Sequence, residues 1–247
     1  MDEEGGGFGG FVKEVAIVVV GALIASTLLR LLVLQVFSIP SRSMESTLNV
    51  GDRVAVQKVQ AFQRGDVVVF RDDLEWLGNP DRFRTEPWQD ALVFLGLMPD
   101  TSSAHLVKRV IGVEGDHVVC CDADDKLTVN GVALEESDYL YADGGMPDAP
   151  SAYAFDVVVP AGRIFVLGDH RSASADSRCH LQEKVLGVDH AGGFPTVESV
   201  VGAASFTLFP FDRWRTFTTP ASFAAIPAAS GPAPAEPVVA VGGDGLC

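Results

Sequence analysis

An apolar run close to the N-terminus constrains this chain more than any other feature. Residues 15–37 read VAIVVVGALIASTLLRLLVLQVF, with one charged side chain, Arg30. As a helix they would reach roughly 35 Å, enough to cross a bilayer core of about 30 Å. The alternative is a cleaved signal peptide, which needs a basic start, a shorter apolar stretch and a small-residue cleavage site. The preceding residues are acidic and glycine-rich instead, so we predict an uncleaved transmembrane anchor over residues 11–37.

Acidic side chains outnumber basic ones by 33 to 18, and the net charge is −15 at pH 7. Phosphate binding needs a basic surface, so this charge argues against nucleic acid as a partner and against a polybasic attachment to anionic lipid. The hydrophobic share of 47% and the mean hydropathy of +0.23 are high for a soluble domain. They fit a membrane segment, so we expect the lipid bilayer as a partner. The oligomeric state leaves no signal in the sequence.

Four cysteines stand at positions 120, 121, 179 and 247, and they match no zinc-binding spacing. None of the usual metal-ligand spacings occurs, so we expect no metal, and we expect no organic cofactor either. The adjacent pair Cys120-Cys121 would bridge to itself only with strain. In an extracytoplasmic domain, Cys179 would pair with one of the two, and the alternative is a set of reduced, half-buried thiols.

Short Val-rich runs separated by turn residues follow the anchor, and no helical stretches alternate with them. This pattern predicts a mostly β fold, in which a single transmembrane helix precedes an antiparallel β-sheet domain over residues 38–215. Asn130-Gly131, between two short apolar runs, predicts a two-residue hairpin turn. Residues 1–10 are expected to be a flexible acidic tail, and the Ala-, Pro- and Gly-rich residues 216–247 a disordered one. The expected strands cover residues 53–59, 66–70, 106–113, 117–121, 155–159, 163–167 and 199–208.

Residues 72–104 interrupt the β pattern as a long insertion that holds Trp76, Phe83, Trp88 and the apolar run 91–98. One interpretation is a surface subdomain with its own small core. The other is a contact with the membrane interface, where tryptophan side chains are well accommodated. The sequence leaves the role of the insertion open.

A loop rich in serine comes directly after the anchor, with hydroxyls at positions 41, 43 and 46. Apolar residues alternate with these serines, which indicates that the loop lines a surface inside the protein rather than merely facing water. They are Ile39, Met44 and Leu48.

A lysine stands inside an apolar strand, in the run His105-Leu-Val-Lys-Arg-Val-Ile-Gly112. Side chains alternate along a strand, so Lys108 and Arg109 point to opposite faces and one of them has to enter the protein. A buried lysine tends to lose its proton, and a neutral amine can act as a general base near pH 7. A structural ion pair with an inward carboxylate is the alternative, and this segment alone does not separate the two.

A strand that ends in a dense polar loop carries the third informative stretch, Val166-Leu-Gly-Asp-His-Arg-Ser-Ala-Ser-Ala-Asp-Ser-Arg178. Its acids and arginines can form ion pairs that fix the loop, and Ser174 could bind a neighbouring amine. Together the three stretches favour nucleophilic catalysis by a serine activated by a lysine. A Ser/His/Asp triad using Asp169 or Asp176 has to be weighed against it, although no G-x-S-x-G motif is present. The histidines available are His105, His117, His170, His180 and His190.

The order of these segments resembles that of bacterial type I signal peptidases. An anchor is followed by I-P-S-x-S-M-x-x-T-L, then G-D-V-V-V-F, then K-R-V-I-G-x-x-G-D, and finally G-D-H-R-S-A-S-A-D-S-R. Five segments match in order over residues 11–215, so the resemblance covers all but the two tails. It departs at Arg42, where Gly is frequent in the family, and at His170 and Ala173, where Asn is common.

The resemblance implies a role for each matching residue. Ser43 would be the nucleophile and Lys108 its general base. The hydroxyl of Ser41 and the backbone N–H of Ser43 would form the oxyanion hole, and Ser174 would orient the lysine. His170 would belong to the scaffold of its loop. The acidic and basic side chains expected to support the site are Asp169, Asp176 and Arg178. The residues expected to line shallow pockets for small substrate residues at positions −1 and −3 are Ile39, Met44, Leu48, Val107 and Leu167.

The implied function is a membrane-bound serine endopeptidase that removes signal peptides from exported preproteins after small residues, of the Ala-x-Ala type, through an acyl-enzyme. Its partners would be those signal peptides and the bilayer. Its catalytic domain would lie on the extracytoplasmic side of the cell membrane, an orientation taken from the family, since flanking charge does not settle it. The alternative is an anchored, non-catalytic β domain that binds exported or envelope proteins.

Overall fold

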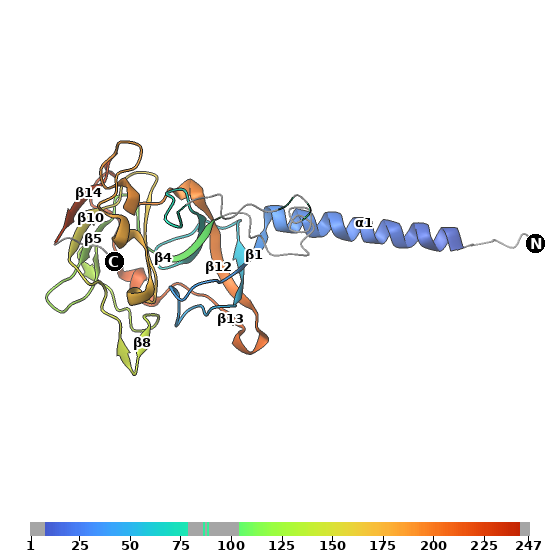
Figure 1. Cartoon of the computed structure of the whole chain (residues 1–247), viewed down its shortest axis with the longest axis horizontal. Helices are drawn as coiled ribbons and strands as arrows, with labels where there is room; N and C mark the ends of the chain where they lie inside the picture. Colours follow the sequence, from blue (N-terminus) through green and yellow to red (C-terminus); the bar gives the residue numbers. More distant parts are fainter. Residues whose placement is uncertain (1–7, 79–85, 87, 89–103, 243–247) are drawn as a thin grey trace, which may run out of the picture.

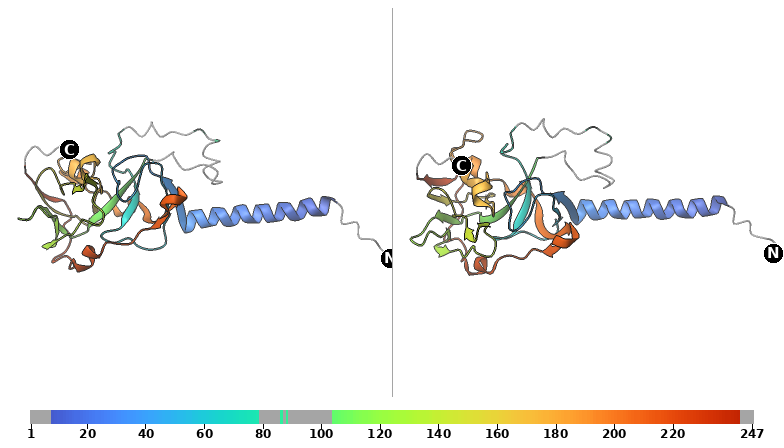
Figure 2. Two further views of the ribbon diagram at one scale, coloured as in Figure 1. Left: turned by 90° about the horizontal axis from the view of Figure 1, so that it is seen from below. Right: turned by 60° about the horizontal axis from the view of Figure 1, so that its bottom comes forward.

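A long helix and a β-rich body make up the molecule (Figure 1). The structure is a computed structural model that describes residues 8–78, 86, 88 and 104–242. Helix α1, Phe8–Leu32, projects away from the body, and the views of Figure 2 agree on this. Within α1, Gly9–Leu28 is long and apolar enough to cross a membrane, and its side chains are exposed. The expected N-terminal anchor is therefore present as a helix.

The apolar run divides into two elements rather than forming one helix. Helix α1 ends at Leu32, and strand β1, Leu34–Ser38, pairs with β2, Arg53–Gln57. The anchor predicted for residues 11–37 is therefore too long at its C-terminal end. The reason is that Phe37 is apolar because the protein core buries it, with 4% of its surface exposed, and not because lipid surrounds it.

The larger sheet is antiparallel throughout, with the order β1-β2-β12-β3-β4-β11, and β13 pairs with β12. The antiparallel pairing confirms the predicted fold class. Most of its strands match predicted ones, because strands that are buried on both faces leave short continuous apolar runs in the sequence. The remaining members of this sheet are β3 (Val67–Arg71), β4 (His105–Val113), β11 (Ile164–Leu167), β12 (Val200–Phe209) and β13 (Arg215–Thr216).

A second antiparallel sheet has the order β14-β10-β5-β6-β7, and a small hairpin pairs β8 with β9. In the β6–β7 hairpin, Asn130 and Gly131 both have positive φ, of 50° and 79°. That backbone suits a two-residue turn, so the predicted hairpin is confirmed. The strands are β5 (His117–Cys120), β6 (Thr128–Val129), β7 (Val132–Ala133), β8 (Ala142–Asp143), β9 (Met146–Pro147), β10 (Phe155–Val158) and β14 (Val238–Val241).

The C-terminal segment is folded where the structure describes it, so the expectation of a disordered tail is wrong for residues 216–242. Strand β14 pairs with β10, and Phe223 and Ile226 pack into the core of the second sheet. Alternating valines in β14 supply a strand that the low-complexity composition concealed. Short 3-10 helices connect the strands: η2 (Arg171–Ala173), η3 (Ser177–His180), η4 (Ala191–Gly193), η5 (Val197–Ser199), η6 (Phe211–Arg213) and η7 (Ala221–Ala225).

Most of the insertion at 72–104, including Phe83 and the apolar run 91–98, lies outside the described residues. At its start, Trp76 packs edge-on against Phe70, with ring centroids 5.9 Å apart. The indole N–H of Trp76 donates to the carbonyl of Gly192 at 2.9 Å. Trp76 therefore belongs to the packing of the β domain, whichever interpretation holds for the rest of the insertion.

Candidate active site

Ser43 and Lys108 meet between the serine loop, residues 39–52, and strand β4. The Nζ atom of Lys108 lies 2.6 Å from the Oγ atom of Ser43, and only 6% of Ser43 and 3% of Lys108 are exposed. The loop is closed at its base by the hydrogen bond from Ile39 N–H to the carbonyl of Asp52, at 2.9 Å. Lys108 is thus held by a strand and Ser43 by a loop with a closed base, and their side chains meet where little of either is exposed.

The environment of Lys108 favours the neutral amine. Burial lowers the pKa of Lys108 from its usual 10.5 to about 8, although the charges of Asp176 and Asp169 act in the opposite direction. At pH 7 about one molecule in ten then carries an uncharged amine, far more than for an ordinary lysine. An uncharged Nζ at hydrogen-bond distance from a hydroxyl can take its proton.

Two further serines lie close to this pair. The hydroxyl oxygens of Ser41 and Ser43 are 3.3 Å apart. Ser174 is buried, with 5% exposed, and its hydroxyl has no hydrogen-bond partner among the described residues. The structure thus brings both serines to the site, while the expected contact from Ser174 to Lys108 stays a prediction.

Gly168 is a functional position that the sequence reasoning missed. A Cβ atom there would overlap the hydroxyl of Ser174 and lie 2.5 Å from the carbonyl oxygen of Ser43. Any larger residue would push these two segments apart. The signal in the sequence was the Gly168-Asp169 pair that directly follows β11.

Two buried ion pairs stand behind the site. Arg109 binds Asp169 at 2.6 Å and lies over the ring of Tyr139, 4.1 Å from its centroid. Arg178 binds Asp176 at 2.8 Å. Burial alone would raise the pKa of Asp176, but the guanidinium of Arg178 outweighs it and holds that pKa below its usual value. The carboxylate of Asp176 therefore remains charged near Lys108.

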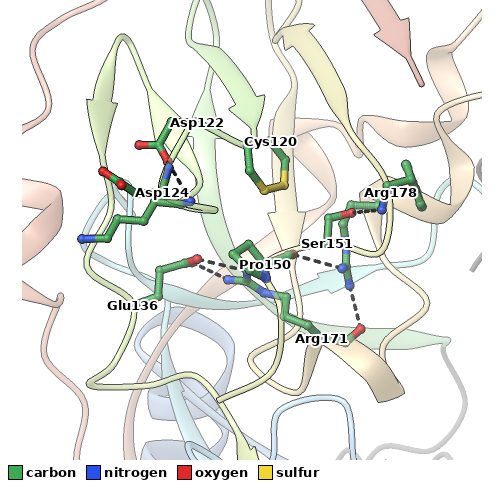
Figure 3. Close-up of a disulfide and its surroundings, with 11 residues drawn as sticks. Cys120, Asp122, Asp124, Glu136, Pro150, Ser151, Arg171 and Arg178 are labelled. Carbon is green, nitrogen blue, oxygen red and sulfur yellow. Dashed lines mark hydrogen bonds and ion pairs between the residues drawn. A yellow bond between two sulfur atoms is a disulfide. The ribbon is translucent and has the colours of Figure 1, made fainter. Parts of the chain in front are cut away.

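A second layer of contacts fixes the loop that carries these acids. Figure 3 shows Arg171 and Arg178 close to Pro150 and the disulfide. Both arginines donate to the carbonyl of Pro150, at 3.1 and 3.2 Å, and Arg171 also forms a buried ion pair with Glu136. Glu136 was missed, because nothing in the acidic run Glu135-Glu136-Ser-Asp138 marks one of its carboxylates as buried.

The cysteines pair differently from the expectation. Cys120 and Cys121 form a disulfide with each other (Figure 3), and Cys179 is disulfide-bonded as well. The expected pairing of Cys179 with Cys120 or Cys121 is therefore wrong, and so is the alternative of reduced thiols at these positions. The described residues contain no group of three His, Cys, Asp or Glu side chains placed to hold a metal ion.

Four of the five residues expected to line the substrate pockets lie together. Ile39, Met44 and Leu48 belong to one buried cluster, and the half-buried Val107 packs against it. Leu167 does not join them. It lies in the core of the second sheet with Phe165, because β11 is buried on both faces and this side chain takes the far one.

The histidines have other partners. His170 Nδ1 lies 3.0 Å from the carboxylate of Glu45, and His117 pairs with Asp156 at 2.6 Å on the surface. His180 stacks on Trp76, with centroids 4.5 Å apart. The hydroxyl of Ser43 has Lys108 and Ser41 as its hydrogen-bond partners. The geometry therefore supports a serine–lysine pair over a Ser/His/Asp triad.

A family model described as signal peptidase, peptidase S26, matches residues 12–209, which include every residue of the site. The chain belongs to this family. It is 38% identical over 222 residues to a signal peptidase I of Mycobacterium tuberculosis, with 82% of this chain and 74% of that protein covered. It is 30% identical to a probable signal peptidase I-1 of Synechocystis, with 88% of this chain and 91% of that protein covered.

Among solved structures, the chain is similar to a signal peptidase I from Enterococcus faecalis. The identity is 23% and the TM-score 0.34, with 58% of this chain and 97% of that chain covered. The assignment rests on the family match and the sequence relatives, and it makes this signal peptidase family member a hydrolase of peptide bonds.

Proposed function

We propose that Ser43 and Lys108 form the catalytic dyad with which this signal peptidase removes signal peptides from exported preproteins. The observation that carries the proposal is the 2.6 Å distance between Lys108 Nζ and Ser43 Oγ in a buried setting. A serine hydroxyl is a weak nucleophile, so it needs such a base within reach.

In the proposed mechanism, the neutral amine of Lys108 takes the proton of the Ser43 hydroxyl while Oγ attacks the scissile carbonyl. The oxyanion that forms accepts hydrogen bonds from the Ser41 hydroxyl and the backbone N–H of Ser43. One such donor is worth roughly 2.7–4 kcal/mol in related chemistry. The ammonium of Lys108 then protonates the leaving amine, which leaves an acyl-enzyme. Lys108 finally activates a water molecule that releases the second product.

We further propose that the apolar cluster of Ile39, Met44, Leu48 and Val107 selects small substrate residues at positions −1 and −3. The three serine-loop members of this cluster are almost fully buried, so little space is open beside them. On this proposal Ala, Gly or Ser would displace the fewest packed atoms, and large side chains the most.

The site is proposed to act at the extracytoplasmic face of the cell membrane. Disulfides persist in oxidising compartments, and Cys120, Cys121 and Cys179 are all disulfide-bonded. Only the short strand β1 separates α1 from the serine loop, so a membrane-spanning α1 would hold Ser43 near the bilayer surface.

The proposal is tested with the full chain in detergent, given a preprotein as substrate. The Ser43→Ala variant should lose cleavage, while Ser172→Ala should keep it, because Ser172 is an exposed serine whose hydroxyl binds Asp148. Near-normal cleavage by a correctly folded Ser43→Ala variant would overturn the mechanism.

A further inference from the structure

Three polar side chains, Arg42, Glu45 and His170, form a network beside the nucleophile. Arg42 Nε donates to the two carboxylate oxygens of Glu45, at 2.8 and 2.9 Å. The carboxylate of Glu45 in turn lies 3.0 Å from Nδ1 of His170. Arg42 and His170 are far apart in the sequence, so only the fold joins them into one network.

The protonation of this network follows from its contacts. The hydrogen bond from Arg42 lowers the pKa of Glu45, so Glu45 is a carboxylate that can only accept hydrogen bonds. Nδ1 of His170 therefore carries a hydrogen and donates it. The ring is held in place by Tyr141, which stacks on it at 3.8 Å between centroids and 19° between planes. Only 7% of the His170 side chain is exposed.

Two residues of this network also form backbone hydrogen bonds to the peptide groups on both sides of Ser43. The backbone N–H of His170 donates to the carbonyl of Ser43 at 3.1 Å, and that of Glu45 donates to the carbonyl of Arg42 at 2.9 Å. The carbonyl of Arg42 and the N–H of Ser43 belong to the same planar peptide. Fixing one of these groups therefore fixes the direction of the other.

We propose that His170 is a positioning residue for the nucleophile, whose Nδ1–H acts through Glu45 and Arg42 to aim the backbone N–H of Ser43 at the oxyanion. This inference rests on the proposed function, because it assigns a task to the same oxyanion hole. His170 touches neither Ser43 Oγ nor Lys108, so its effect is exerted through the loop.

A loosened oxyanion donor affects the transition state more than the bound substrate. Removing the Nδ1–H donor should therefore lower kcat and leave KM nearly unchanged. A merely structural role would instead lower the melting temperature, with no such separation between kcat and KM.

Two substitutions of His170 distinguish the effect of its Nδ1–H donor from that of its stacked ring. His170→Asn places an amide N–H near the position of Nδ1 and removes the stacked ring, while His170→Phe keeps a stacked ring and removes the donor. We expect kcat to fall about tenfold in His170→Phe and to stay within about twofold of the parent in His170→Asn, since a misdirected donor loses part of the effect of a deleted one.

Glu45→Ala removes the acceptor at the partly exposed side of the network, so it tests the proposal even where His170→Phe fails to fold. It should lower kcat as His170→Phe does, and the double variant should fall no further than either single one, because the two side chains act through one contact. His117→Phe is the matched control, because it removes the exposed pair with Asp156 at 2.6 Å. It should leave kcat and KM unchanged.

Equal losses in His170→Asn and His170→Phe would overturn the proposal in favour of ring packing. So would an unchanged kcat in Glu45→Ala, additive losses in the double variant, or an effect confined to KM. Ser43→Ala is measured in parallel. If that variant cleaves normally, the proposed function itself fails, whereas an inactive Ser43→Ala beside fully active His170→Phe and Glu45→Ala variants defeats only this inference.

Discussion

Lys108 and Arg109 are neighbours on β4, and burial has opposite consequences on the two faces of that strand. On one face, the hydrogen-bond partner of Lys108 among the described residues is a hydroxyl, and burial lowers its pKa to about 8. On the other, Arg109 is bound by both carboxylate oxygens of Asp169, at 2.8 and 2.6 Å. Burial alone would lower the pKa of Arg109 as well, but Asp169 raises it. Burial therefore favours the neutral amine of Lys108, which has no carboxylate in direct contact among the described residues, whereas direct contact with Asp169 keeps the guanidinium of Arg109 charged.

The largest expected effect is the loss of activity when Lys108 is replaced by a residue that cannot accept a proton. Lys108→Arg preserves charge but cannot act as a base, and Lys108→Met removes the amine altogether. Both should lower kcat/KM by about 10²–10⁴-fold, the usual contribution of a general base. Preprotein cleavage by the purified full chain measures this, with the exposed Lys126→Met as control. Substantial activity in Lys108→Arg would show that the positive charge matters rather than the base.

On the face of β4 that carries Arg109, loss of the ion pair with Asp169 should lower the free energy of unfolding. Asp169→Asn leaves Arg109 buried without its counter-charge, which typically costs about 3–5 kcal/mol. Chemical unfolding of the full chain measures this, and Asp156→Asn, at an exposed pair with His117, is the control. The double variant Arg109→Met/Asp169→Leu should recover most of the loss, because no buried charge remains. A stable Asp169→Asn protein would mean that water or another group reaches Arg109.

Lys108 should itself reduce stability at neutral pH. The folded protein holds the pKa of Lys108 at about 8, whereas an unfolded chain restores 10.5. Between these values the unfolded state binds more protons, so stability rises with pH from 8 to 10.5. Below pH 8 the full cost of about 3 kcal/mol applies. Relative to the parent, Lys108→Met should thus be most favoured below pH 8 and lose that advantage towards pH 10.5. A difference independent of pH would place the amine in contact with solvent.

The pH dependence of cleavage also tests whether the neutral amine of Lys108 is the base. Only the neutral form of Lys108 can accept the proton, so kcat/KM should fall by a factor that approaches tenfold per pH unit below pH 8 and level off above it. About half of the amine is neutral at pH 8 and about 1% at pH 6, so the loss between these values should be about 50-fold. Initial rates over this range on a fixed preprotein give the profile, and a flat line down to pH 6 would contradict the assignment.

Ser174 should have the smallest effect. Its hydroxyl is buried but lacks a hydrogen-bond partner among the described residues, so Ser174→Ala leaves no new unsatisfied group. We expect kcat/KM to fall by about tenfold or less if the hydroxyl orients the amine during turnover. Ser172→Ala is the control from the same loop. A loss as large as that of Lys108→Met would move Ser174 into the reacting group itself.

The sequence was informative wherever a feature depends on a residue and its immediate sequence neighbours. A lysine inside an apolar strand indicated a buried amine, and the alternation of β4 placed Arg109 on the opposite face, where it is buried too. The antiparallel sheets and the Asn130-Gly131 turn were also predictable, because short apolar runs and turn residues mark them directly in the sequence. The dyad, by contrast, needed the resemblance, because no local pattern says that Ser43 and Lys108 meet.

The rest depended on long-range packing. Nothing near Glu136 in the sequence indicates its buried ion pair with Arg171. The need for glycine at position 168 arises only because the segments that carry Ser43 and Ser174 approach its backbone closely. The boundary between α1 and β1 was misplaced because lipid and a protein core select the same apolar residues. The valines of β14 were overlooked because the surrounding composition resembles that of a disordered chain.

The junction between α1 and β1 has a mechanical consequence. Only Val33 separates the helix from a strand that the larger sheet holds by hydrogen bonds along its length. A single residue leaves little freedom between them, so if α1 spans a membrane as proposed, a tilt of the helix would move the serine loop with it. The distance of Ser43 from the bilayer surface would then limit which peptide bonds of a substrate can reach it.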